Sequence, residues 1–313
     1  MTNLWVWKYA LESATTLNSK ANRRVYEGAL VRLGSGFGCL HPWPELGDAS
    51  LAECLADLAG PQNLPLVKRS LACIAQDAKA REEGRSLFEG LQVPPSHATI
   101  GGFDRGAVEQ AAARGFTHLK VKAGSQIKRD LSQIRDAIRE WPSLRWRIDF
   151  NENGNLDHFL REFRGWSDEE MSAIDFLEDP LPYPRGGAES WSTLREATGL
   201  ALANDRWVEK DDGSSEILVV KPAVNEMIRD PRVIVTTYLD HPLGQVFAAW
   251  EAAHAGVKNL CGLQTHGVFR KSDFTEILGE PGPKFRVPEG SGLGFIEALE
   301  SLEWIKLNHE RSS

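Results

Sequence analysis

The chain has 313 residues, of which 42% are hydrophobic and 26% are charged. This length and composition are typical of a globular protein with a sizeable buried core. The formal net charge of −8, without any block of basic residues, argues against nucleic acid and anionic membrane surfaces as partners.

The N-terminal stretch MTNLWVWKYALESATT lacks the basic and apolar regions of a signal peptide. No apolar run in the chain is long enough to cross a bilayer, so we expect a cytoplasmic protein. The eight histidines are scattered, and none is assigned to chemistry. The sequence predicts reduced structural thiols rather than a zinc or redox motif, because no CxxC pair occurs among Cys39, Cys54, Cys73 and Cys261.

Residues 1–97 have the pattern of an α+β domain. The stretch RRVYEGALVRLGSGFGCLHPWPELGD predicts a β-hairpin, with a turn at GSGFG and a loop at PWPELGD. A helix is predicted from an N-cap at Ser50 to Gly60, and a second helix begins at Pro65. The two prolines of VPPSH, residues 93–97, predict a linker after these helices.

From residue 98 to residue 288 the chain alternates short apolar strands with amphipathic helices. Alternating β and α elements indicate a parallel sheet, and eight such strands would close into a barrel. Because the segments after the fifth and sixth strands are short, we expect an α/β fold with a modified TIM barrel of the (β/α)7β type. The eight candidate strands are HATIGGF, THLKVKAG, RWRIDFNEN, AIDFLEDPL, LALAND, EILVVKPA, RVIVTTYLD and NLCGLQT.

Charged side chains stand at or near the carboxyl ends of five successive strands, where a βα barrel builds its active site. In THLKVKAG the period-2 alternation places both lysines on one face. Three carboxylates on adjacent strands would repel one another unless a cation lies between them, and oxygen ligands favour Mg²⁺, with Mn²⁺ as a substitute. The candidate site residues are Lys120, Lys122, Asp149, Glu178, Asp205 and Lys221.

Each of these residues also has an ordinary structural explanation. A single Asp at a strand end is usually a helix cap or a turn residue, and a single Lys in an apolar strand is usually at the surface. The joint occurrence on five successive strands is hard to obtain from caps and turns. Glu152 and Asp179 are out of phase with Asp149 and Glu178, so they are interpreted as helix-capping or solvent-facing residues.

With these motifs the chain resembles the enolase superfamily, in the branch that has a lysine on each side of the cavity. KVKAG is similar to the Lys-x-Lys strand, RIDFNENG and FLEDPLPY to the metal strands, and VVKPA to the second-lysine strand. The resemblance implies a capping domain at 1–97, completed by part of 289–313, and a catalytic barrel at 98–288. It implies that Mg²⁺ is held by three carboxylates and that the lysines act on the proton α to a carboxylate; the carboxylates are Asp149, Glu178 and Asp205.

In this scheme Lys122 is the base, Lys221 is the lysine opposite, and Lys120 neutralises the substrate carboxylate and keeps Lys122 unprotonated. The compact length resembles the o-succinylbenzoate synthase group, which implies dehydration of a cyclohexadiene carboxylate on the way to menaquinone. The sequence departs from many members of the superfamily in having Arg206 after Asp205, where those relatives have Glu.

Two other functions remain open. One is an N-acylamino acid racemase or dipeptide epimerase, in which Lys122 and Lys221 act on opposite faces of one carbon. The other is a non-catalytic metal-binding barrel. The loop from Gly36 to Asp48 would decide between the reactions because it covers the substrate, with His41 or Trp43 as contacts. The expected partner is a small-molecule carboxylate, and the oligomeric state is left open.

Overall fold

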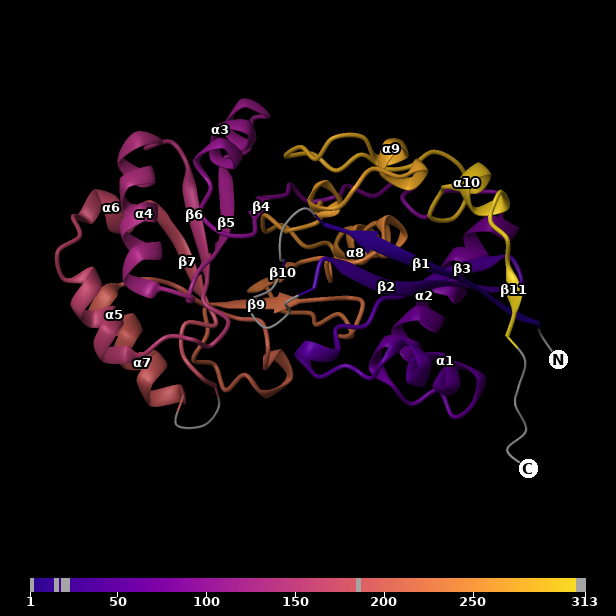
Figure 1. Ribbon diagram of the computed structural model, residues 1–313, viewed down its shortest axis with the longest axis horizontal. Helices are drawn as coiled ribbons and strands as arrows, with labels where there is room; N and C mark the ends of the chain where they lie inside the picture. The colour runs from indigo at the N-terminus through magenta and orange to yellow at the C-terminus, as the bar shows by residue number, and fades with distance from the viewer. Residues whose placement is uncertain (1–2, 14–16, 18–22, 184–186, 308–313) are drawn as a thin grey trace.

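The computed structural model describes residues 3–13, 17, 23–183 and 187–307. These residues form a four-stranded antiparallel sheet in the order β11-β1-β2-β3 and a seven-stranded parallel sheet in the order β10-β9-β8-β7-β6-β5-β4. Figure 1 shows the helices α4 to α7 on the outside of the parallel strands at the left, with the antiparallel sheet at the right. The α/β barrel class predicted from the sequence is confirmed.

The N-terminal half combines the antiparallel sheet with two helices. Its elements are β1 (Leu4–Glu12), β2 (Val25–Leu33), β3 (Gly36–Leu40), η1 (Pro44–Leu46), α1 (Leu51–Ala59) and α2 (Pro65–Glu82). The hairpin and both helices are confirmed, whereas β1 is a strand that the sequence analysis did not identify. The predicted cap of α1 is also present, since Ser50 and Glu53 form a reciprocal capping box and Gly60 follows the last turn.

The predicted turn GSGFG is only partly a turn. The chain reverses at Gly34 and Ser35, and β3 already begins at Gly36. Glycine is needed inside this strand because β3 packs directly on α2: a Cβ atom at Gly38 would lie 2.6 Å from the Ser70 hydroxyl oxygen. The second half of the motif therefore serves the packing of a strand on a helix.

The barrel follows as strands separated by helices. Its elements are β4 (Ala98–Ile100), α3 (Arg105–Ala113), β5 (His118–Lys122), α4 (Ile127–Glu140), β6 (Arg145–Asp149), α5 (Leu156–Phe163), α6 (Asp168–Ser172), β7 (Ile174–Glu178), α7 (Gly187–Thr198), β8 (Leu202–Asn204), η2 (Val208–Lys210), β9 (Ile217–Val220), β10 (Val233–Val235) and α8 (Pro242–His254). The segments after β8 and β9 are short, as expected, and in the described residues neither contains an α-helix. A single 3-10 turn, η2, occupies the first of these gaps.

The predicted eighth strand, NLCGLQT, is not a regular strand. It joins the two edges of the sheet through two single parallel bridges, Ser96 with Cys261 and Thr236 with Gly262. The backbone N–H of His97 donates to the Cys261 carbonyl at 2.8 Å, and the N–H of Gly262 donates to the Val235 carbonyl at 2.8 Å. The barrel is thus closed by the segment that contains Cys261 and Gly262, which bridges to the residue before His97 on one side and to the residue after β10 on the other.

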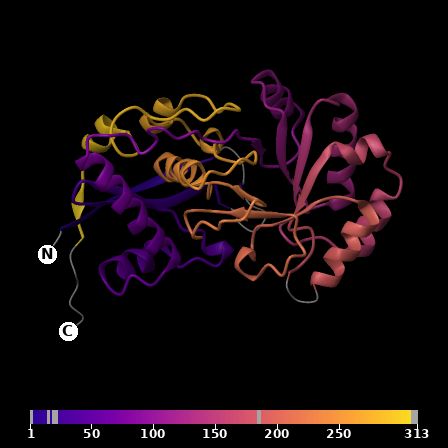
Figure 2. The same ribbon diagram turned by 180° about the vertical axis from the view of Figure 1, so that it is seen from behind.

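The last part of the chain returns to the N-terminal half, as Figure 2 shows from behind. Asp77 of α2 anchors this return, because its carboxylate accepts the backbone N–H groups of Leu293 at 2.7 Å and Phe37 at 2.9 Å. The elements of this part are η3 (His266–Val268), α9 (Asp273–Leu278), α10 (Ile296–Glu300) and β11 (Ile305–Lys306), which pairs with β1.

The apolar core runs through both halves. On β5, Leu119 and Val121 are almost completely buried and pack with the residues of the helix layer. Another cluster joins Tyr26 and Trp43 of the N-terminal half to Tyr238, which follows β10. The loop after β3 is therefore packed against the mouth of the barrel. No helix within the described residues is both long enough and apolar enough to span a membrane.

Candidate active site

A cavity of about 330 Å³ opens at the carboxyl ends of the barrel strands, below the loop that follows β3. This volume is typical of sites for small molecules. The cavity is lined by five of the six candidate residues, namely Lys120, Lys122, Asp149, Asp205 and Lys221. Glu178 is 1% exposed and accepts a hydrogen bond from the lining residue Lys120.

The strand register places the candidate residues side by side. Lys122 is opposite Asp149 in the β5–β6 pair, and Asp149 is opposite Glu178 in the β6–β7 pair. Lys221 follows β9, four strands along the sheet from β5, so the two lysines stand on opposite sides of the cavity. The lysines of the KVK stretch point inward because the alternate residues of β5 pack against the helices.

Two of the three lysines are paired with the carboxylates. The ammonium nitrogen of Lys120 lies 3.2 Å from Asp149 Oδ2 and donates a hydrogen bond to Glu178 Oε1. Lys221 donates from Nζ to Asp205 Oδ2. Lys122 has neither a hydrogen bond nor an ion pair among the described residues. It is the free amine of the set.

The electrostatics differ between the two neighbouring lysines. Burial lowers the pKa of Lys122; Asp149 opposes this effect, but the positive charges of Lys120 and Lys221 act with burial, so that the pKa lies below the usual lysine range. Burial also acts to lower the pKa of Lys120, but the adjacent Asp149 and Glu178 outweigh it and raise that pKa well above its usual value. Lys120 is therefore held as a cation beside a lysine that gives up its proton more readily.

The carboxylates are also perturbed. Burial raises the pKa of Glu178 to about 7, and the nearby Asp149 and Asp205 act in the same direction. For Asp149 the opposing effect of burial is outweighed by Lys120 and Lys122, which hold its pKa below the usual range. Neighbouring carboxyl groups whose environments separate their pKa values are typical of functional sites.

The interpretation of Asp179 as a capping or solvent-facing residue is wrong. Asp179 is 2% exposed, and its Oδ1 accepts the backbone N–H of Asp205 at 3.0 Å. The side chain does not follow the alternation of the strand because β7 ends at Glu178 and Asp179 has a positive φ of 41°. Burial and the neighbouring Asp205 raise the pKa of Asp179 well above its usual value. This side chain positions the backbone of Asp205.

Glu152 is neither a helix cap nor a solvent-facing residue. Its Oε1 accepts hydrogen bonds from the indole N–H of Trp207 at 2.8 Å and from the backbone N–H of Tyr183 at 3.2 Å. Like Asn151 before it, Glu152 has a positive φ, at 63°. Backbone strain of this kind clusters at functional sites, and here it turns the chain after β6 across the end of β7.

The donor set of the three carboxylates fits a hard divalent cation by its chemistry. Two of their oxygens, Glu178 Oε2 and Asp205 Oδ1, are buried without a hydrogen-bond partner among the described residues. An ion could satisfy both, and oxygen-only ligands favour Mg²⁺. Within the described ranges, no three His, Cys, Asp or Glu side chains are already arranged as a metal site. The carboxylates are instead paired with Lys120 and Lys221.

The loop after β3 contributes one wall of the cavity. Trp43 lines it, and its indole N–H donates to the Tyr238 carbonyl at 2.9 Å. His41 does not line the cavity; it is 1% exposed and hydrogen-bonds to the Tyr9 hydroxyl at 3.0 Å. Of the two suggested contacts, only Trp43 is thus placed to meet a ligand.

Among the lining residues that the sequence did not indicate are Tyr238 and His97. Tyr238 stands beyond the end of β10, and the rule that was applied to the other strand ends would have found it. His97 lies just before β4, and its Nδ1 accepts a hydrogen bond from Arg147 Nη1 at 2.9 Å, a contact between distant segments that sequence spacing does not show. The four cysteines are free thiols, in agreement with the sequence.

Comparison with protein families gives two matches. Residues 4–80 match the family model described as O-succinylbenzoate synthase, N-terminal domain. Residues 104–210 match the model described as Enolase C-terminal domain-like. An o-succinylbenzoate synthase of Bdellovibrio bacteriovorus is 27% identical to the chain, over 96% of this chain and 97% of that protein.

Solved structures show a similar fold. An enolase-superfamily member from Listeria innocua superposes with a TM-score of 0.78 at 17% identity, over 98% of this chain and 99% of that one. A dipeptide epimerase from Cytophaga hutchinsonii, in complex with Mg and a dipeptide, gives 0.76 at 18% identity over 98% and 99%. The o-succinylbenzoate synthase from Thermosynechococcus elongatus, with Mg in its active site, gives 0.67 at 19% identity over 86% and 95%.

Proposed function

We propose that this chain, which belongs to the enolase superfamily, is an o-succinylbenzoate synthase. The reaction is the loss of water from 2-succinyl-6-hydroxy-2,4-cyclohexadiene-1-carboxylate to give o-succinylbenzoate, a step of menaquinone biosynthesis. The 27% identity to a curated enzyme of that name over nearly the whole chain supports this reaction, as does the N-terminal family match.

Proton abstraction in this cavity is supported by the pair of lysines on its opposite sides, next to three strand-end carboxylates, and the choice of dehydration is supported by the relative of that name. Lys122 is the base. Its lowered pKa leaves more of it in the neutral form, and it has no partner among the described residues that would hold its proton. Lys120, whose charge is kept by Asp149 and Glu178, faces the substrate carboxylate.

Lys122 Nζ takes the proton from the ring carbon that bears the carboxylate. The electron pair left on that carbon forms a ring double bond as the carbon–oxygen bond at C6 breaks, and the protonated Lys122 returns the proton to the departing hydroxide. The products are an aromatic ring and one water. Lys221 stands opposite, where its ammonium can face the ring that becomes aromatic.

A divalent cation fits beside these lysines. Asp149, Glu178 and Asp205 would hold Mg²⁺, with Mn²⁺ as a substitute, and the bound ion would supply positive charge to the substrate carboxylate as the neighbouring carbon loses its proton. Mg in two of the similar structures supports this choice. A carbon acid α to a carboxylate is too weak for an amine to deprotonate in water, which is why such charge is required.

The proposal is tested by following aromatisation of the cyclohexadiene substrate in the ultraviolet, with and without Mg²⁺. Turnover should require the ion and should fall at least about 10²-fold in Lys122→Met. Lys258→Met, an exposed lysine next to α8, is the matched control and should keep full activity. Absence of turnover by the wild-type protein with Mg²⁺ would reject the synthase.

A second candidate is a racemase or epimerase of N-acylated amino acids or dipeptides. The two facing lysines favour it equally, since one can remove a proton and the other can return it on the opposite face. Exchange of the α-proton with deuterium from the solvent, measured by NMR on such a substrate, separates the two. Exchange without aromatisation would assign the epimerase, and neither activity would favour a non-catalytic barrel.

A further inference from the structure

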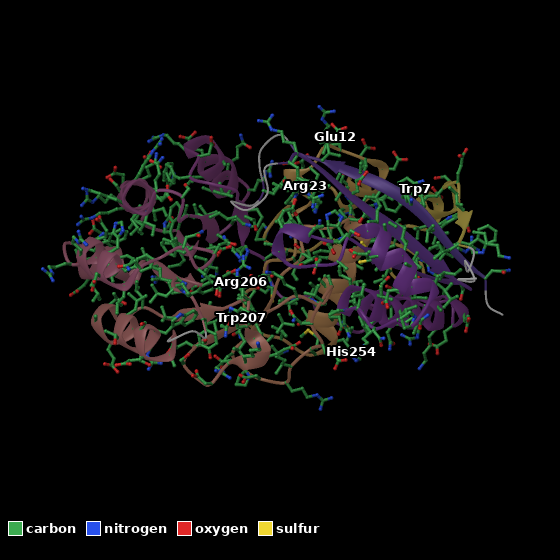
Figure 3. All side chains as sticks on the ribbon, turned by 60° about the horizontal axis from the view of Figure 1, so that its bottom comes forward. Trp7, Glu12, Arg23, Arg206, Trp207 and His254 are labelled. Atoms are coloured by element: carbon green, nitrogen blue, oxygen red, sulfur yellow. The ribbon has the colours of Figure 1, made fainter. Side chains whose placement is uncertain are left out.

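Arg206 is a cation of the cavity that the lysine chemistry does not use. Among the described residues that line the cavity it is the only arginine. Arg206 follows the third carboxylate, Asp205, beyond the end of β8, and Figure 3 shows it next to Trp207. It is three strands along the sheet from Lys122, so a ligand that reacts at Lys122 must extend across the cavity to reach it.

The guanidinium of Arg206 is poorly satisfied. Its Nε lies 3.4 Å from Glu152 Oε2, and its Nη2 lies 3.5 Å from Asn151 Oδ1. Hydrogen bonds from arginine to a carboxylate are normally about 2.7–2.9 Å. Nε is buried and has no hydrogen-bond partner among the described residues. Among the described residues the guanidinium thus makes only these two long contacts, so N–H groups of Arg206 remain available to a ligand in the cavity.

Glu152 does not depend on Arg206 for its own hydrogen bonds. Its carboxylate is fixed by the Trp207 indole at 2.8 Å and by the Tyr183 backbone at 3.2 Å. Glu152 is therefore held by short hydrogen bonds to other groups, whereas the contact of Arg206 with Glu152 is long. A second carboxylate, supplied by a ligand, could take the free edge of the guanidinium while Glu152 keeps its place.

We propose that Arg206 binds a second, distal carboxylate of the substrate and so selects dicarboxylates. This inference rests on the proposed function, in which the first carboxylate is beside the carbon that Lys122 attacks and the second is at the end of the succinyl chain. A guanidinium offers two parallel N–H groups to a carboxylate, which a lysine cannot do. The cavity then binds a carboxylate at each end of its ligand.

The test compares two ligands that differ only at the distal group. Isothermal titration calorimetry in Mg²⁺ would measure the binding of o-succinylbenzoate and of the analogue in which the succinyl carboxylate is a primary carboxamide. The wild-type protein should bind the dicarboxylate at least about tenfold more tightly, in line with a charge-assisted hydrogen bond. Arg206→Gln should bring this ratio close to one and leave the affinity for the amide within about twofold.

Arg164→Gln, an exposed arginine after α5, is the control and should keep the wild-type ratio. The inference is overturned if the wild-type protein does not distinguish the ligands or if the ratio survives in Arg206→Gln. It is also overturned if that variant weakens both ligands equally, which would mean that Arg206 only supports the fold. Turnover is measured separately. If the wild-type protein prefers the dicarboxylate but shows no turnover, the synthase is rejected. If it shows turnover but no preference between the two ligands, the Arg206 site is rejected.

Discussion

The hydroxyl group of Tyr238, beyond the end of β10, donates a hydrogen bond to Asp48 Oδ2 at 2.9 Å. Asp48 also accepts the backbone N–H of Trp43 at 2.8 Å, so the same carboxylate holds both ends of the loop after β3. The ring of Tyr238 lies 5.9 Å from the Lys221 ammonium. One tyrosine therefore connects the covering loop to a lysine of the cavity.

Tyr238→Phe should weaken substrate binding more than it slows the chemical step. The change removes the hydrogen bond to a carboxylate, worth about 1.5–3 kcal/mol, but keeps the ring beside Lys221. If part of this energy holds the loop over the substrate, KM should rise about five- to tenfold while kcat changes about twofold at most. Steady-state kinetics of the proposed dehydration would measure both.

Tyr183→Phe is the matched control, because the Tyr183 hydroxyl donates to the Lys210 carbonyl at 3.0 Å and neither residue lines the cavity. It should lower stability without raising KM. Equal KM values for Tyr238→Phe and the wild-type protein would show that the Asp48 contact does not hold the loop in the bound state.

Arg147→Met should destabilise the fold by about 3 kcal/mol. Arg147 is 4% exposed inside the barrel, where it pairs with Asp175 at 2.7 Å and donates to the Leu260 carbonyl at 2.9 Å. Together with its contact to His97, this ties β6 to the segment that closes the barrel. Removing one partner of a buried charged network typically costs about 3–5 kcal/mol, and the partial exposure of Asp175 favours the lower end.

Urea unfolding followed by circular dichroism would measure this loss. Arg145→Met is the control on the same strand, because Arg145 is exposed and its side chain donates to the Ser172 carbonyl rather than to a carboxylate. It should change the free energy of unfolding by less than about 0.5 kcal/mol. An Arg147→Met protein as stable as the Arg145→Met protein would mean that the barrel closes without this network.

Local sequence patterns predicted those features of the fold that depend on a single segment of the chain. The alternation around Lys120 and Lys122 and the N-cap at Ser50 each depend on neighbours in the chain. The same logic predicted the strand ends that carry Asp149 and Glu178. These features could be read without the tertiary structure because strand and helix periods fix which side chains share a face.

The features that the sequence did not predict depend on contacts between distant segments or on irregular backbone. The phase rule assumes a regular strand, and it failed at Asp179 because the backbone there has a positive φ. The contact of His97 with Arg147 joins β6 to the start of β4 across the barrel. The segment around Gly262 resembles a strand in composition, but it forms only single bridges to its neighbours. No short stretch of sequence specifies these arrangements.

Asp240→Asn should make stability less sensitive to pH. Burial raises the pKa of Asp240 to about 7, and its Oδ1 has no hydrogen-bond partner in the part of the chain that the structure describes. The unfolded chain has the ordinary value of about 3.9. Between these values the folded state holds a proton that the unfolded state releases, so the free energy of unfolding decreases as the pH rises towards 7 and then stays low.

From pH 5 to pH 8 the wild-type protein should therefore lose about 2–3 kcal/mol of its free energy of unfolding relative to Asp240→Asn, so the variant is relatively more stable at the higher pH. Urea titrations at both pH values would measure it. Asp136→Asn, on the exposed face of α4, should show no such change. A constant difference for Asp240→Asn would mean that this carboxyl group titrates normally in the folded protein.

Mg²⁺ should stabilise the folded protein, and Glu178 should be required for most of the effect. A ligand that binds only the folded state raises the melting temperature by mass action, so millimolar Mg²⁺ should raise it by several degrees in the wild-type protein. Glu178→Gln keeps the shape of the side chain but removes the charge and one of the two unpartnered carboxylate oxygens, and should lose most of this shift. Glu209→Gln, exposed on η2, should keep it. Differential scanning fluorimetry across a Mg²⁺ titration measures all three proteins, and an undiminished shift in Glu178→Gln would place the ion elsewhere.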